Sequence, residues 1–278
     1  MILVKLKGGL GNQMFQYATA KMLAKKTKLF FDNNFFDLHN TSNDYFTARE
    51  FSLHIFTKIK IIKANQILKY ILKKTLLPGS KRIFQSEENE WIDFKKIAFS
   101  HAYINGYFQN ENYFKEIRNE LLIDFNFPEV QEYNLPLEQQ ITMEENSVAM
   151  HVRRGDYLKP HVESFHGVLP IDYYKLAVEK INKRVHAPHY YIFSDDPAWC
   201  EQNFKFLKTE YTIVSKPGNY DWEEMKIMGC CKHYIIANSS YSWWAAWLNK
   251  NPDKIVIAPR NWLVKKELDI IPAAWLKI

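Results

Sequence analysis

Four clusters of glycine and polar residues in this sequence are of the types that bind phosphates, sugars or nucleotides. Arginine binds phosphate through two parallel hydrogen bonds and keeps its charge at every physiological pH. Arg153 and Arg154 within HVRRGDY therefore predict a diphosphate site, with a surface ion-pair network involving Asp156 as the alternative. The four clusters are residues 8–13 (GGLGNQ), 151–157 (HVRRGDY), 194–196 (SDD) and 238–242 (NSSYS).

The NSSYS cluster stands directly before a tryptophan-rich stretch that is expected to be helical. Hydroxyl groups and free backbone N–H groups at a helix start form a site for anions. Asn238, Ser239 and Ser240 are therefore expected to contact phosphate, although helix capping would explain one of the serines.

The SDD cluster has three interpretations: a metal site, a reader of ribose or base, or a helix cap. Adjacent residues of an extended chain point to opposite sides, so Asp195 and Asp196 are poorly placed to chelate one ion. The Asp-x-Asp triplet of magnesium-dependent sugar transferases does not occur in the sequence. Asp196 precedes Pro197 and would suit an N-cap.

The GGLGNQ cluster partly matches a dinucleotide-binding fingerprint. Gly9 and Gly11 fit its first two glycines, Met14 replaces the third, and Asp32 stands about where a ribose-binding acid would. The cluster predicts either NAD binding or a glycine turn that brings the backbone close to another ligand.

Strands and helices alternate along the chain, which predicts parallel, doubly wound sheets. We expect two Rossmann-like domains facing a cleft, with each cluster at the carboxyl end of a strand, where ligands of such sheets bind. Residues 127–146, with two prolines and many acids, are the predicted linker. The predicted domains are an acceptor-side domain at 1–130, a donor-binding domain at 147–260 and a tail at 261–278. The expected strands are 2–6, 28–32, 102–107, 147–152, 189–196, 211–215, 233–240 and, last, 254–259, and the main helices are 14–27, 170–184, 196–204, 221–231 and 241–249.

Composition places the chain among ordinary globular proteins, with 47% apolar and 24% charged residues. Cys200, Cys230 and Cys231 form no C-x-x-C pair, which favours a reducing compartment over a zinc site or a disulfide framework. The apolar run before Lys5 is too short for a signal peptide, so a cytoplasmic location is expected.

Residues 51–86 contain no Asp or Glu, although the whole chain has a net charge of only +6. Ile61, Ala64, Leu68 and Ile71 recur there at helical spacing. The pattern predicts either a core-facing helix with a solvated basic face or a basic helix resting on phosphates or on the inner membrane surface. The basic residues of the stretch are Lys58, Lys60, Lys63, Lys69, Lys73, Lys74, Lys81 and Arg82.

Taken together, three motifs resemble the bacterial α-1,2-fucosyltransferases of glycosyltransferase family 11. They are KLKGGLGNQMFQYA at 5–18, HVRRGDY at 151–157 and ANSSYSWWAAWLN at 237–249. The resemblance implies a GT-B fold and an inverting, metal-independent transfer of L-fucose from GDP-β-L-fucose to the 2-hydroxyl of a galactose in a glycan acceptor. No cofactor and no nucleic-acid partner is implied, and the particular galactoside stays open.

The resemblance also implies roles for single residues. Arg153 and Asp156 are the expected catalytic residues, with Asp156 as first choice of general base before Glu163 and His166. Glu224 stands where related enzymes carry an acid that reads guanine. The expected donor-binding residues are Gly9, Gly11, Asn12, His151, Arg153, Arg154, Asp195, Asp196, Glu224, Asn238, Ser239 and Ser240. An NAD-dependent oxidoreductase and a non-catalytic phosphate- or membrane-binding protein are the alternatives.

Overall fold

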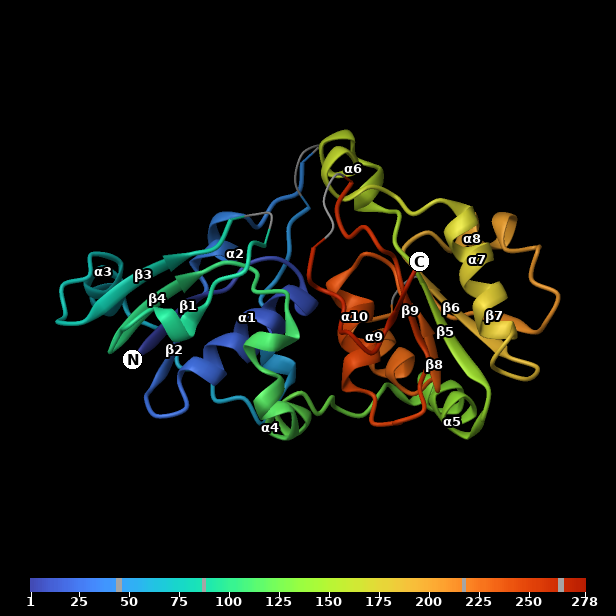
Figure 1. Cartoon of the computed structure of the whole chain (residues 1–278), viewed down its shortest axis with the longest axis horizontal. Helices are drawn as coiled ribbons and strands as arrows, with labels where there is room; N and C mark the ends of the chain where they lie inside the picture. Colours follow the sequence, from blue (N-terminus) through green and yellow to red (C-terminus); the bar gives the residue numbers. More distant parts are fainter. Residues whose placement is uncertain (44–46, 87–88, 217–218, 265–267) are drawn as a thin grey trace. The chain divides into compact units, whose positions relative to one another are not determined.

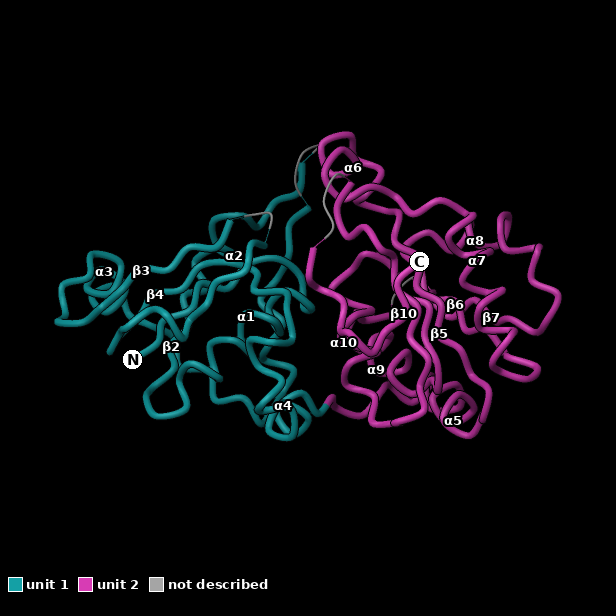
Figure 2. The backbone as a smooth tube through the Cα atoms, viewed as in Figure 1, with its two compact units in different colours: residues 1–126 teal, residues 127–278 magenta. Residues whose placement is uncertain are grey.

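The computed structural model describes residues 1–43, 47–86, 89–216, 219–264 and 268–278. The chain divides into two compact units, Met1–Asn126 and Phe127–Ile278 (Figure 2). Each unit is built on its own parallel sheet, so the predicted α/β class with parallel sheets is confirmed. Among the described residues, no helix is long and apolar enough to cross a bilayer.

Unit 1 contains a four-stranded parallel sheet in the order β2-β1-β4-β3 (Figure 1). The strands are β1 (Ile2–Lys5), β2 (Leu29–Asp32), β3 (Ser80–Phe84) and β4 (His101–Asn105). The helices are α1 (Leu10–Leu23), α2 (Asn34–Leu38), α3 (Gln66–Lys73) and α4 (Arg118–Asp124). Short 3-10 helices span Leu53–Ile55, Phe94–Lys96, Glu111–Tyr113 and Lys115–Ile117.

Two predictions for unit 1 need correction. Helix α1 begins at Leu10 rather than at residue 14, because Gly9 is extended and serves as the N-cap, so Gly11 and Asn12 lie in the first helical turn. The helix predicted from the spacing of Ile61, Ala64, Leu68 and Ile71 begins later than residue 61. Asn65 accepts a hydrogen bond from the Leu68 N–H (2.8 Å) and starts α3 there, and the unpredicted strand β3 follows.

Unit 2 contains a six-stranded parallel sheet in the order β10-β9-β8-β5-β6-β7. Counted along the chain from β5, this is the order 3-2-1-4-5-6 of Rossmann sheets. The strands are β5 (Ser147–Val152), β6 (His189–Ser194), β7 (Tyr211–Ile213), β8 (His233–Ile235), β9 (Val256–Ala258) and β10 (Leu276–Lys277). The helices are α5 (Leu135–Met143), α6 (Pro160–His166), α7 (Ile171–Asn182), α8 (Pro197–Asn203), α9 (Asp221–Gly229) and α10 (Ser240–Leu248), with 3-10 helices at Glu132–Asn134 and Asp156–Leu158.

Both faces of the unit 2 sheet are covered, which is why β5 and β6 are buried at every position. Figure 1 shows α7 and α8 on one side of the sheet and α9 and α10 on the other. Tyr174, Ile181 and Phe204 belong to the core cluster that packs against the first side.

The two ends of unit 2 differ from the predicted boundaries. The expected linker contains α5, and its Glu138 pairs with Lys226 of α9 (3.0 Å), so it is part of the folded unit. The predicted last strand is β9, and the predicted tail adds β10 beside it. The tail thus completes the edge of the sheet.

Candidate functional site

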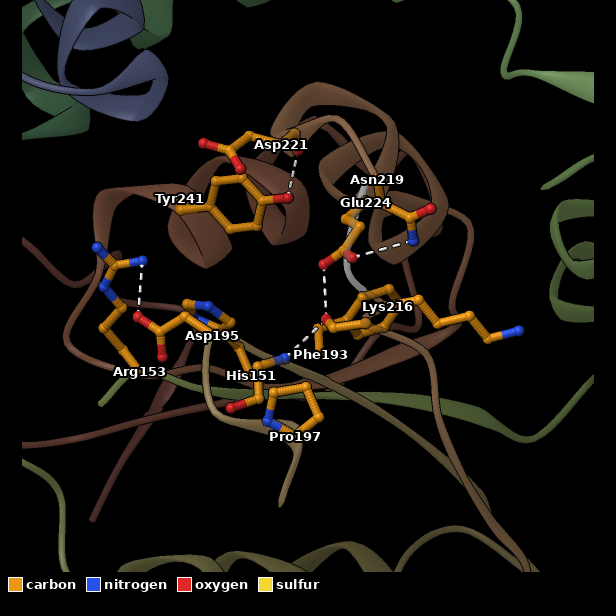
Figure 3. A pocket seen from close by; sticks show the side chains of 12 residues that line it. His151, Arg153, Phe193, Asp195, Pro197, Lys216, Asn219, Asp221, Glu224 and Tyr241 are labelled. Carbon is orange, nitrogen blue, oxygen red and sulfur yellow. Dashed lines mark hydrogen bonds and ion pairs between the residues drawn. The ribbon is translucent and has the colours of Figure 1, made fainter. Parts of the chain in front are cut away.

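A polar pocket lies at the carboxyl ends of β5 and β6 in unit 2 (Figure 3). Arg153 follows β5, Asp195 follows β6, and α9 and α10 supply Glu224 and Tyr241. The structure thus brings four predicted site residues, His151, Arg153, Asp195 and Glu224, into one place. The lining residues are His151, Arg153, Phe193, Ser194, Asp195, Pro197, Ser215, Lys216, Asn219, Asp221, Glu224 and Tyr241.

Arg153 is fixed by two carboxylates at the edge of this pocket. One terminal nitrogen donates to Asp156 Oδ1 (2.6 Å) and the other lies 3.0 Å from Asp195 Oδ2. Burial alone would lower the pKa of Arg153, but the two carboxylates outweigh burial and raise it. A guanidinium has five N–H donors, so these two contacts leave others for a ligand.

Arg154 and Asp196 form a second ion pair that serves helix α8. Arg154 Nε lies 3.2 Å from Asp196 Oδ2, and its guanidinium stacks 4.1 Å from the ring of Trp199. Asp196 Oδ1 accepts from the Trp199 N–H (3.1 Å), which makes Asp196 the N-cap. Neither residue is among the described residues that line the pocket. The capping interpretation of Asp196 is therefore confirmed.

Asp195 organises the turn after β5. Its Oδ1 accepts from the Arg154 N–H (2.8 Å) while Oδ2 faces Arg153. A Cβ on Gly155 would approach Asp195 Oδ2 to 2.7 Å, so any other residue there would push the Asp195 carboxylate out of its present position. Glycine in HVRRGDY therefore allows the aspartate after β6 to reach the arginines after β5.

His151 is a neutral imidazole in the pocket wall. It is 5% exposed, and burial, with a contribution from the charge of Arg153, lowers its pKa to about 3. Nδ1 lies 2.9 Å from Ser242 Oγ, and that hydroxyl donates to the carbonyl of Ser239 (3.4 Å). The Ser242 hydroxyl therefore fixes the orientation of the His151 ring.

Glu224 is held by donors from the loop after β7. Ser215 Oγ donates to Oε2 (2.6 Å) and Asn219 Nδ2 to Oε1 (3.2 Å). The Ser194 N–H donates in turn to Ser215 Oγ (2.9 Å), which links Glu224 to the end of β6. Burial raises the pKa of Glu224, although the bonds from Ser215, Asn219 and the Lys216 backbone oppose the rise.

The residues at 238–240, which were predicted to contact phosphate, have structural contacts: they cap the start of α10 or hold the end of α6. Ser239 accepts from the Tyr241 N–H (3.3 Å) as the N-cap of α10, and Ser240 is the first helical residue. Asn238 Nδ2 donates to the carbonyls of His166 (2.8 Å) and Gly167 (3.2 Å) at the end of α6. Of the described residues in this cluster, Tyr241 lines the pocket and these three do not.

The three candidate bases lie in the 3-10 helix Asp156–Leu158 and in the helix α6 that follows it. Asp156 is bonded to Arg153, and Glu163 is exposed in the first turn of α6. His166 stacks on Tyr157 (ring centroids 4.9 Å apart), and burial lowers its pKa, with Asp156 opposing the shift and Arg153 adding to it. Asp156 thus has a positioning contact to the arginine, and its role as base stays a prediction.

In unit 1, the glycine cluster builds the start of α1. Gly8 has φ +77°, a conformation that favours glycine, and a Cβ there would meet the Asn12 side chain at 2.7 Å. Asn12 Oδ1 accepts from Gln109 Nε2 (2.7 Å). The buried Gln13 donates to the carbonyls of Gly8 (2.9 Å) and Glu50 (2.8 Å). The turn therefore fixes the loop that follows α2.

Asp32 does not have the environment expected of a ribose-binding acid. It is 1% exposed, with Lys69 Nζ 3.1 Å and Lys73 Nζ 2.6 Å from its two oxygens. The lysines lower the pKa of Asp32 although burial, the largest single influence, would raise it. A carboxylate closed off in this way has no surface for a cofactor, which removes the main support for the NAD alternative.

Sequence reasoning missed Ser215, Lys216 and Asn219. They follow β7, so the rule that ligands bind at the carboxyl ends of strands would have found them if it had been applied to SKPGN as well. Ser242, which orients His151, lay within a recognised motif but was given no role.

No group of three His, Cys, Asp or Glu side chains that could hold a metal occurs within the described ranges. Metal independence stays a prediction that activity measurements must test.

An arginine and a neutral histidine at the carboxyl end of a parallel strand, with the half-buried carboxylate of Glu224 beside them, form a site of the kind that binds nucleotides. The model of the family "Glycosyl transferase family 11" matches residues 1–277. The chain therefore belongs to glycosyltransferase family 11, as its motifs predicted.

Three curated relatives define the neighbourhood within the family. The chain is 36% identical to the Escherichia coli O-antigen biosynthesis glycosyltransferase WbnK, over 92% of this chain and 93% of that protein. It is 31% identical to an Escherichia coli alpha-1,2-colitosyltransferase, over 100% and 99%. It is 26% identical to the Bos taurus galactoside 2-alpha-L-fucosyltransferase SEC1, over 88% and 63%.

Proposed function

We propose that this protein transfers L-fucose from GDP-β-L-fucose to the 2-hydroxyl of a galactose residue, with inversion and without a metal ion. The observation that carries the proposal is the presence of Arg153 and Glu224 in one pocket of a family 11 chain. The names of relatives that act as α-1,2-colitosyl and galactoside 2-α-L-fucosyl transferases support the linkage and the sugar class. A GT-B arrangement of the two units belongs to the same proposal.

Glu224 reads the guanine in this proposal. Its carboxylate accepts hydrogen bonds only, and guanine offers two adjacent donors, N1–H and the 2-amino group. These take the acceptor directions that Ser215 and Asn219 do not use. Uracil has no such pair of adjacent donors, so Glu224 would select the nucleobase of the donor. His151 is uncharged near neutral pH because burial lowers its pKa to about 3, so it suits the neutral nucleoside better than a phosphate.

Arg153 holds the diphosphate. Figure 3 shows its guanidinium on one side of the pocket and Glu224 with Asn219 across from it. Asp156 and Asp195 hold the planar guanidinium of Arg153 in one orientation. Lys216 also lines the pocket, but Figure 3 shows its side chain extending away on the side of Glu224, opposite to Arg153. Arg154, Asp196 and Asn238 support this arrangement through the local structure, and Ser239 with Ser240 sets the start of α10.

The proposed fucosyl transfer uses these contacts as follows. The galactose 2-hydroxyl attacks the anomeric carbon of fucose as GDP leaves from the opposite face, so negative charge grows on the β-phosphate. A fixed guanidinium stabilises that charge in the transition state more than in the ground state. Asp156 is the proposed acceptor of the hydroxyl proton, and Gly9, Gly11 and Asn12 in unit 1 are proposed to face the sugars.

Mass spectrometry of products with paired donors and acceptors tests this function. The enzyme is incubated with GDP-fucose, GDP-colitose, GDP-mannose or UDP-galactose, each with a β-galactoside and with a glucoside. We expect transfer from GDP-fucose to the galactoside. Transfer from GDP-colitose alone would correct the donor sugar but keep the nucleotide assignment, whereas transfer from UDP-galactose would contradict the role of Glu224.

A further inference from the structure

Helix α3 in unit 1 is oriented by charge rather than by apolar packing alone. Lys69 and Lys73 both reach Asp32 at the end of β2, and Lys69 Nζ also donates to Asn34 Oδ1 (2.6 Å). Lys69 is only 5% exposed. Since an unpaired buried ammonium is very costly, these contacts fix which side of the helix faces inward. The inward side is made of Lys69, Lys73 and the buried Leu72.

This orientation turns large apolar side chains outward. Ile67 is 71% exposed and Tyr70 is 59% exposed, and the two are neighbours one helical turn apart. Lys74, seven residues after Ile67, lies on the same side and is also exposed. The stripe predicted from Leu68 and Ile71 as the core-facing side is only half-buried.

A fourth residue is fixed outward just after the helix. The Leu76 N–H donates to the carbonyl of Ile71 (3.0 Å), and the next residue, Leu77, packs against the cluster of Leu3, Leu72 and Tyr103. Leu76 itself is 58% exposed. The backbone therefore holds Leu76 at the surface. We call Ile67, Tyr70, Lys74 and Leu76 the α3 face.

The stretch of chain that carries the α3 face is basic, even though Lys69 and Lys73 are paired with Asp32. The α3 face lies within residues 51–86, where there is no acidic residue, and the exposed Lys63 and Lys81 flank it in the sequence. An exposed group of large apolar side chains marks a surface that binds something. Basic charge around apolar anchors complements a surface that is both anionic and able to take up apolar groups.

We propose that the α3 face docks on the surface of an anionic lipid bilayer. Ile67 and Leu76 insert at the level of the acyl boundary, Tyr70 stays at the headgroups with its hydroxyl in water, and Lys74 faces anionic lipid. Burial of the apolar side chains supplies the hydrophobic part of the binding free energy, and the lysines supply the part that salt weakens. The proposal concerns unit 1 alone and does not depend on the donor or acceptor assigned above.

Sedimentation with vesicles tests the proposal on the full chain. We expect binding to phosphatidylcholine vesicles that contain phosphatidylglycerol, weaker binding in high salt, and little binding to phosphatidylcholine alone. Replacing Ile67 together with Tyr70 should weaken binding about tenfold or more, from the area no longer buried. Removing two basic charges should also weaken it about tenfold or more. The two double variants are Ile67→Gln with Tyr70→Gln, and Lys74→Glu with Lys81→Glu.

Matched controls change the same chemistry elsewhere and should bind as the wild type does. For the apolar pair they replace Ile123 and Met143, which are 63% and 82% exposed, by Gln. For the charged pair they replace the exposed Lys205 and Lys208 by Glu. Absence of wild-type binding to anionic vesicles, or equal loss in the controls, would overturn the proposal.

Two further measurements separate the alternatives. Light scattering shows whether the wild type is a dimer that the Ile67→Gln, Tyr70→Gln variant makes monomeric, and that result would replace the membrane by a second copy of the chain. Transfer to a soluble galactoside should be unchanged in this variant. If transfer is absent in every form while vesicle binding follows the expected pattern, the proposed function fails and the membrane proposal stands.

Discussion

Replacing Glu224 by alanine tests whether this carboxylate binds the guanine. The same contact can be removed from the nucleotide by using IDP in place of GDP. IDP lacks the 2-amino group of GDP and is otherwise the same. Hydrogen bonds to charged groups contribute about 1.5–3 kcal/mol each, or roughly a 10- to 150-fold change in Kd. We therefore expect the wild type to bind GDP at least tenfold more tightly than IDP. Glu224→Ala should weaken GDP binding by a comparable factor and make the two nucleotides nearly equal.

Isothermal titration calorimetry with both nucleotides and both proteins completes this cycle. Asp221→Asn is the control, because Asp221 lines the same pocket on the same helix and the substitution changes the charge equally. It should keep the preference for GDP. Because the carboxylate is the form that accepts from guanine, and burial raises the pKa of Glu224, GDP affinity should fall at a higher pH on acidification than an ordinary glutamate would give. A Glu224→Ala protein that still prefers GDP over IDP would refute the assignment.

Three other variants test the remaining parts of the site and fold. Asp156→Asn should lower turnover by ~10²–10⁴ in initial-rate assays while leaving GDP affinity nearly intact; parallel loss of both would make Asp156 a positioning residue for Arg153. Since burial lowers the pKa of His151 to about 3 and the unfolded side chain titrates near 6.5, the unfolded state binds the extra proton, and the free energy of unfolding should fall by up to about 1.4 kcal/mol per pH unit below pH ~6.5. Urea unfolding at several pH values measures this dependence of the free energy of unfolding on pH, and the contribution of His151 should be absent in the His151→Asn protein. Asp32→Asn leaves Lys69 buried without its counter-charge and should cost about 3–5 kcal/mol in the same assay; a change below about 1 kcal/mol would mean that the ion pair does not anchor α3.

The sequence was most informative where a buried strand is followed directly by polar residues. Continuous apolar runs predicted β5 and β6 because both faces of that sheet are covered, and the residues that follow them, Arg153 and Asp195, do meet in one pocket. Glu224 came from the resemblance, since nothing in its local sequence separates it from Glu223, which is 0% exposed and accepts from the Gln131 N–H.

Local sequence does not separate residues that brace the fold from residues that bind a ligand. Arg154, Asp196 and Asn238 were predicted to bind the donor, and in the structure they hold α8 and α6 instead of lining the pocket, so their contact with the donor stays a prediction. Apolar spacing correctly predicted that Ala64 and Leu68 contribute to the core. It also placed Lys69 on the solvated basic face, whereas Asp32, more than thirty residues away in the sequence, draws that lysine inward. Pairings of this kind depend on the assembled sheet and have no local signal.

The most direct test of the central claim follows the reaction of GDP-β-L-fucose with a β-galactoside in excess EDTA by ¹H NMR and assigns the linkage of the product by a long-range ¹H–¹³C correlation spectrum. We expect a new α-fucosyl anomeric proton that correlates with galactose C2, formed at the same rate with and without the chelator. A β-linked product, a linkage to another hydroxyl, or activity that EDTA abolishes and Mg²⁺ or Mn²⁺ restores would contradict the claim.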